Sequence, residues 1–146
     1  MTQHEVKVVW QDGLHFAGTT NDPLADDFAI QLDADPEDGG QGKGIRPAKL
    51  LLTALAGCMG MDVISILRKK KQQVSGFEIR VKADRAAEHP KVYTTIWLFF
   101  VVTGTKIDPA AVARAVELSY TKYCPIANLI KPVVPVETDY QILEAA

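Results

Sequence analysis

Two cysteines are the residues of this 146-residue chain best suited to carry chemistry. Cys124 directly precedes Pro125, whose ring keeps the residue before it out of the helical region, so the pattern predicts Cys124 as the N-cap of a short helix that Pro125 opens. At that place a thiol faces unpaired N–H groups and the positive end of the helix dipole, which favour a thiolate. Cys58 lies instead among small residues, where another backbone or a second chain could approach closely.

A long helix, from residue 47 to about residue 73, is expected to carry Cys58. Its residues 50–67 are mostly apolar and are followed by four cations, which also fits the length of a membrane span. Asp62 argues against a span, because a carboxylate deep in a membrane costs about 2.5 to 3.5 kcal/mol. We therefore expect a buried core helix and no membrane partner.

A helix that is apolar on nearly all sides needs cover on more than one face. Because one small sheet covers a single face, we expect a second copy of the chain to cover the other. The small residues that would permit close contact are Ala54, Gly57 and Gly60. Such a contact places Cys58 near a subunit interface.

Strand and helix patterns follow one another in the order βββαββααβ. The strands are expected at residues 5–10, 14–19, 28–32, 77–83, 92–103 and 134–143, and two shorter helices at residues 109–123 and 125–131. This order predicts an α+β fold with mainly antiparallel sheet, and the chain length predicts one domain over residues 1–146. The glycine-rich residues 33–44 predict a loop before the long helix, either a lid or a solvated connector.

Composition and spacing argue against several functions. A net charge of −2 offers no basic field for nucleic acid. Two cysteines and three histidines, at positions 4, 15 and 89, lack the spacing of metal ligands, and no phosphate loop indicates a cofactor. The N-terminal residues lack an apolar signal segment, so we expect a cytoplasmic, reducing location, where two thiols are redox-active or idle rather than permanently bridged.

The residues around both cysteines form a recognisable pattern. It consists of Pro47-x-x-Leu50-Leu51-x-x-Ala54-Leu55-x-x-Cys58, Asp62-Val63, Tyr123-Cys124-Pro125-Ile126 and Val134-Pro135-Val136. The pattern resembles the OsmC/Ohr family of organic hydroperoxide reductases, over essentially the whole chain. The resemblance implies an OsmC-like fold in which antiparallel sheets wrap the long central helices of an intertwined homodimer.

The resemblance also implies the roles of the two thiols, with Cys58 peroxidatic and Cys124 resolving. A Cys58 thiolate would attack a small organic hydroperoxide, become a sulfenic acid and condense with Cys124 to a disulfide that an external dithiol reduces. The family's peroxidases support the thiolate with an arginine in the N-terminal strand region and a glutamate after the helix-opening proline. Here Ala48 stands at the glutamate position, and no arginine precedes Arg46.

Other charged groups are candidates for the missing support, namely Arg46, Lys49 and His15. Asp62, one turn after Cys58 on the same helical face, either opposes the thiolate by like charge or pairs with another group. Without the arginine and glutamate we expect a weakened peroxidase. The alternatives are a non-catalytic dimer that binds a small apolar ligand or senses redox state, and a structural dimer with inert thiols.

Overall fold

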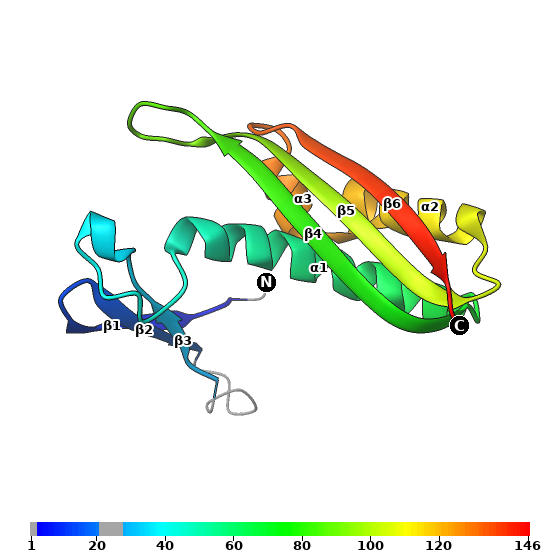
Figure 1. The fold of residues 1–146 in the computed structure, drawn as a ribbon, viewed down its shortest axis with the longest axis horizontal. Coiled ribbons are helices and arrows are strands. Elements are labelled where there is room, and N and C mark those ends of the chain that lie inside the picture. Colours follow the sequence, from blue (N-terminus) through cyan, green and yellow to red (C-terminus); the bar gives the residue numbers. More distant parts are fainter. Residues whose placement is uncertain (1–2, 21–27) are drawn as a thin grey trace. The chain divides into compact units, whose positions relative to one another are not determined.

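The computed structural model describes residues 3–20 and 28–146 (Figure 1). The strands are β1 (Val6–Asp12), β2 (His15–Thr20), β3 (Ile30–Leu32), β4 (Gln73–Arg85), β5 (Tyr93–Thr105) and β6 (Val136–Glu144). The helices are α1 (Pro47–Lys69), α2 (Pro109–Leu118) and α3 (Pro125–Ile130), with a 3₁₀ turn at Pro36–Asp38 and a π-helical turn at Ser119–Tyr123. The predicted α+β class is confirmed.

The chain divides into two compact units, Met1–Leu51 and Leu52–Ala146. The first contains a three-stranded sheet in the order β1-β2-β3, and the second contains another in the order β4-β5-β6. The helix α1 begins in the first unit and continues into the second. The expectation of a single domain over residues 1–146 stays a prediction.

The two sheets are mainly antiparallel, as predicted, but the second sheet contains one parallel pair. The strands β4 and β5 are antiparallel, but β5 and β6 are parallel, with Ile96 opposite Val136. A parallel pair needs a long crossover, and the segment with α2 and α3 supplies it. The prediction is therefore wrong for β5–β6, because alternation along a strand carries no information about its direction.

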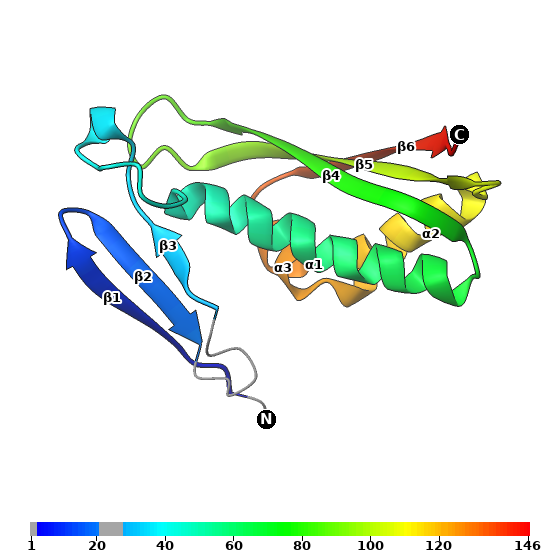
Figure 2. The ribbon, with the colours of Figure 1, turned by 60° about the horizontal axis from the view of Figure 1, so that its bottom comes forward.

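The helices α1, α2 and α3 lie on one face of the second sheet (Figure 2). Four side chains of α1, at intervals of four residues, are fully buried there: Leu55, Met59, Val63 and Leu67. Alternate residues of β5 meet them in the same core: Ile96, Leu98, Phe100 and Val102. Both periodicities are those of elements with one buried face.

The face of α1 opposite to the core is apolar, and Gly57 and Met61 on it are exposed among the residues that the structure describes. Met61 is 73% exposed on it, and a Cβ atom added to Gly57 would meet nothing within 4 Å. Gly60 differs from the expectation, since a Cβ atom there would come 2.8 Å from Cδ1 of Ile79 on β4. Gly60 therefore permits close packing of α1 on its own sheet rather than on a partner.

The length and composition of α1 alone would allow it to cross a membrane. The most apolar window of Pro47–Lys69 has a mean hydropathy of 2.0, and 28% of it is buried. Core helices of soluble proteins have the same properties, and one face of α1 does pack in the core.

Several apolar side chains of the first sheet are also exposed. On β1, Val6 is 68% and Trp10 is 61% exposed. Every residue of β1 is exposed, so alternation along this strand does not produce a buried face within the chain.

The segment between β3 and α1 is an ordered connector built around Asp33. The Asp33 carboxylate accepts hydrogen bonds from the backbone N–H groups of Lys43 (3.1 Å), Ala34 (2.7 Å) and Gln41 (3.2 Å). The bond from Lys43 contributes most to lowering the pKa of the Asp33 carboxyl, and together the three outweigh the effect of burial. This carboxylate thus fixes the path of the glycine-rich loop.

Two helices end earlier than predicted. The helix α1 ends at Lys69 rather than near residue 73, and Lys71 just beyond it takes the left-handed φ of 56°. The helix α2 ends at Leu118, and the π-helical turn Ser119–Tyr123 completes the stretch that the sequence predicted as α-helix.

Candidate redox site

The proline-directed prediction for Cys124 is confirmed. Cys124 has an extended backbone, with φ −79° and ψ 110°, and it is the N-cap of α3, with Pro125 at the first helical position. Its Sγ atom accepts a hydrogen bond from the backbone N–H of Ala127 at 3.3 Å. The restriction that Pro125 imposes on the preceding residue thus determines where the helix begins.

The structure brings the two cysteine side chains together. The Sγ atoms of Cys58 on α1 and Cys124 at the start of α3 lie 2.8 Å apart, with the Cys124 thiol donating to the Cys58 sulfur. Both are free thiols. Since a disulfide has an S–S distance of about 2.05 Å, the sulfurs need to approach by less than about 1 Å to form one.

The two thiols differ in burial. Cys124 is 0% exposed, whereas Cys58 is half-buried. Burial, followed by the hydrogen bond to Cys58, raises the pKa of Cys124 to about 11, although the Ala127 N–H acts in the opposite direction. The expectation that the helix end makes Cys124 a favoured thiolate is therefore wrong, because desolvation of the charged form exceeds the stabilisation by the N–H groups.

A second polar contact lies beside the thiols. The Ser119 hydroxyl donates to Oδ2 of Asp62 at 2.8 Å, and Ser119 is fully buried. Of the two roles considered for Asp62, the pairing with another group is therefore the one that the structure contains. Sequence reasoning missed Ser119, because a single serine near the end of an amphipathic helix gives no signal of its own.

The three cationic candidates for support lie in the first unit, whereas both thiols and Asp62 lie in the second. The Arg46 guanidinium forms ion pairs with Asp35 at 2.9 Å and with Asp38 at 3.5 Å. Lys49 lies in the first turn of α1, and His15 begins β2. Their support of a thiolate stays a prediction.

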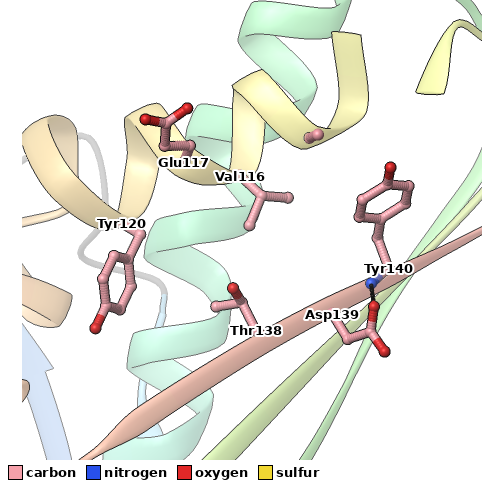
Figure 3. A pocket seen from close by; sticks show the side chains of 7 residues that line it. Val116, Glu117, Tyr120, Thr138, Asp139 and Tyr140 are labelled. Atoms are coloured by element: carbon pink, nitrogen blue, oxygen red, sulfur yellow. Dashed lines mark hydrogen bonds between the residues drawn. The ribbon is translucent and has the colours of Figure 1, made fainter. Parts of the chain in front are cut away.

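A separate pocket of about 260 Å³ opens in the second unit between α2, the π-helical turn and β6. Figure 3 shows Val116 and Thr138 between the rings of Tyr120 and Tyr140, and neither cysteine is among the lining residues. Within residues 3–20 and 28–146, no three His, Cys, Asp or Glu side chains gather in a way that could hold a metal ion. The thiol pair of Cys58 and Cys124 lies outside this pocket.

Comparison with known proteins gives consistent matches. The family model described as OsmC-like protein matches residues 40–139. Protein YhfA of Escherichia coli K12 is 36% identical over 141 residues, which are 97% of this chain and 99% of YhfA. A hypothetical protein from Aquifex aeolicus VF5 is 29% identical, with a TM-score of 0.85 over 100% of both chains. The organic hydroperoxide resistance protein OhrB of Bacillus subtilis shares the fold, at 17% identity and a TM-score of 0.62 over 96% of this chain and 98% of OhrB.

Proposed function

Because the chain belongs to the OsmC-like protein family, we propose that it reduces organic hydroperoxides through a redox cycle of Cys58 and Cys124. The observation that carries the proposal is the 2.8 Å contact between the two sulfurs. Two free thiols in contact form a disulfide with little movement of the backbone, which a two-thiol reduction cycle requires. Some structural relatives are named as hydroperoxide resistance proteins, which fits this chemistry.

In the first step, the Cys58 thiolate attacks the terminal oxygen of the hydroperoxide. The O–O bond breaks, Cys58 becomes a sulfenic acid, and the leaving alkoxide takes a proton to become an alcohol. The burial of the two thiols supports this assignment, because peroxide can reach the half-buried Cys58 more readily than the fully buried Cys124. The Cys124 S–H group also donates toward the Cys58 sulfur, so the two reacting sulfurs already face each other.

In the second step, the Cys124 sulfur attacks the Cys58 sulfenic acid and the S–O bond breaks. The Cys124 proton leaves with the hydroxide as water, and the Cys58–Cys124 disulfide forms. An external dithiol then reduces this disulfide by two exchange reactions and leaves as its own disulfide. A protonated Cys124 suits this order, because its proton is available when the leaving group needs it.

Thiolate support is weaker than in family peroxidases that contain the arginine and the glutamate. Ala48 cannot supply a carboxylate, and the Arg46 guanidinium is shared between Asp35 and Asp38. We expect turnover slower by about one to two powers of ten than with a fixed guanidinium on the thiolate. Lys49 and His15 remain the other cationic candidates.

The uncovered apolar faces support assembly as a homodimer. The exposed face of α1 around Gly57 and Met61, and the exposed apolar side chains of β1, are surfaces that a second copy would remove from water. Two thiols kept free also fit a reducing, cytoplasmic location, which is part of the proposal.

A redox-sensing or small-ligand-binding dimer is the second candidate function. It is favoured by the pairing of Arg46 within its own loop, since that leaves the guanidinium already neutralised. In this case Cys58 and Cys124 would form a disulfide on oxidation without rapid turnover of peroxide.

Rapid mixing of the reduced protein with cumene hydroperoxide and a dithiol tests the proposal. We expect turnover in the wild type, none in Cys58→Ser, and in Cys124→Ser a trapped sulfenic acid that dimedone labels on Cys58. Asp84→Ala, an exposed change on β4, is the matched control. Unchanged turnover in Cys58→Ser, or wild-type protein that hydroperoxide does not oxidise, would contradict the enzymatic function.

A further inference from the structure

A hydrogen bond next to the thiol pair joins the same two parts of the second unit. Asp62 lies one helical turn after Cys58 on α1, and its Oδ2 atom accepts from the Ser119 hydroxyl at 2.8 Å. Ser119 is the first residue of the π-helical turn whose C-cap is Cys124. The two contacts, sulfur to sulfur and hydroxyl to carboxylate, therefore connect α1 to the two ends of one short turn.

The backbone of that turn completes the connection. The N–H of Cys124 donates to the carbonyl oxygen of Ser119 at 2.9 Å, which is the hydrogen bond that closes the wide π-helical turn. Ser119 thus binds α1 with its side chain and Cys124 with its carbonyl group. These three contacts, together with the turn of α1 that separates Cys58 from Asp62, form a closed ring.

The strength of the Asp62–Ser119 contact follows from its surroundings. Ser119 is 0% exposed, so water does not compete for its hydroxyl. A buried hydroxyl that loses its acceptor is left without a hydrogen-bond partner, which is costly. The half-buried Asp62 is therefore a firm anchor at one end of the turn, and Cys124 is the residue that this anchor holds in place.

We propose that Asp62 and Ser119 are positioning residues that hold Cys124 against Cys58 and so set how readily the disulfide closes. The inference rests on the proposed function only in taking the two thiols as a redox pair. Loss of the hydrogen bond frees the π-helical turn in the dithiol state, which lowers the effective concentration of Cys124 at Cys58. The reaction of Cys58 with peroxide is not slowed.

The effective concentration is measured by equilibrating the protein with mixtures of reduced and oxidised dithiothreitol. In this exchange the two protein thiols lose two electrons and two protons to oxidised dithiothreitol, and no peroxide takes part. We expect Ser119→Ala and Asp62→Ala to lower the effective concentration about tenfold, whereas Asp62→Asn, whose amide oxygen still accepts from Ser119, stays within about twofold of the wild type. A hydrogen bond that stabilised only the fold would act equally on the dithiol and disulfide forms, and it would leave this quantity unchanged.

Asp84→Ala, an exposed change on β4, is the matched control and should match the wild type. If Ser119→Ala does not fold, the positioning role is tested by comparing the effective concentrations of Asp62→Ala and Asp62→Asn. Equal effective concentrations in those two variants, or no loss in a folded Ser119→Ala, would overturn the positioning role.

A single-turnover reaction with cumene hydroperoxide separates the inference from the proposed function. We expect Ser119→Ala to form the Cys58 sulfenic acid at the wild-type rate and to retain it about tenfold longer. If peroxide fails to oxidise Cys58 in any variant while the dithiothreitol equilibrium still shifts, the enzymatic proposal fails and the positioning role stands. If peroxide oxidises Cys58 and the sulfenic acid lifetime is unchanged, the positioning role fails and the enzymatic proposal stands.

Discussion

The Cys124 thiol donates to the sulfur of Cys58 across 2.8 Å, yet the two side chains have different access to solvent. Cys124 is fully buried and its pKa is raised to about 11, whereas Cys58 is half-buried. The pair is therefore asymmetric, and we expect its two members to react differently with reagents.

We expect iodoacetamide at pH 8 to modify Cys58 well before Cys124. With a pKa of about 11, roughly 0.1% of Cys124 is thiolate at that pH, and burial limits access further. Mass spectrometry of peptides from the partly alkylated protein measures both sites, and the protein in denaturant, where both should react at similar rates, is the control. Equal modification of both cysteines in the folded protein would contradict the asymmetry.

Ionisation of Cys124 should make the reduced protein lose stability at alkaline pH. The folded-state pKa is raised above the ordinary value of 9.0, so above about pH 9 the unfolded chain releases the proton while the folded chain keeps it. The contribution is complete below pH 9, and about 2 to 3 kcal/mol is lost as the pH rises toward 11. Urea unfolding of the reduced wild type and of reduced Cys124→Ala measures the contribution of Cys124 to the free energy of unfolding, because the two proteins have their other titrating groups in common. Parallel stability curves from pH 8 to pH 11 would contradict it.

Local sequence signals predicted the elements around the site. Pro125 predicted the cap at Cys124, and the apolar run of residues 50–67 predicted a core helix, because both signals depend on residues that are close together in the sequence. The resemblance, rather than spacing, pointed to the pairing of Cys58 with Cys124, which are 66 positions apart.

Contacts between residues far apart in the sequence could not be predicted, because they depend on how the elements pack. The Asp62–Ser119 hydrogen bond joins residues 57 positions apart, and neither residue signals the other. The parallel pairing of β5 with β6 depends on the path of the crossover. The dipole argument for Cys124 was incomplete for the same reason, since burial depends on the elements that surround α3.

Replacing Asp33 should loosen the connector before α1. In Asp33→Asn the amide group brings its own N–H donors toward the backbone donors of Gln41 and Lys43, so we expect these two amides to exchange faster by roughly an order of magnitude. Hydrogen exchange followed by NMR measures them, with the exposed change Asp84→Asn as the control. Unaltered exchange at both amides would show that the carboxylate does not hold the loop.

The ordering of this connector by the Asp33 carboxylate should depend on pH in the acid range. The folded-state pKa of Asp33 is lowered, chiefly by the bond from the Lys43 N–H, so its stabilising contribution is present above the ordinary value of 3.8. The contribution is lost as the pH falls from there through the folded-state pKa. We expect the protection of Gln41 and Lys43 to fall in this range in the wild type and to be independent of it in Asp33→Asn.

A charge on the exposed face of α1 should separate the two copies of the proposed dimer. Met61 is 73% exposed in the single chain, so Met61→Lys should change the stability of an isolated chain by no more than about 0.5 kcal/mol. In a dimer that buries this face, the lysine loses its hydration without a partner, and we expect dissociation to become at least about tenfold easier. Sedimentation equilibrium at micromolar concentration measures the dimer against the 16.0 kDa monomer, with Gln141→Lys, an exposed change on β6, as the control. A wild type that is monomeric at this concentration, or equal dissociation of the two lysine variants, would mean that the apolar face of α1 is not where a second copy binds.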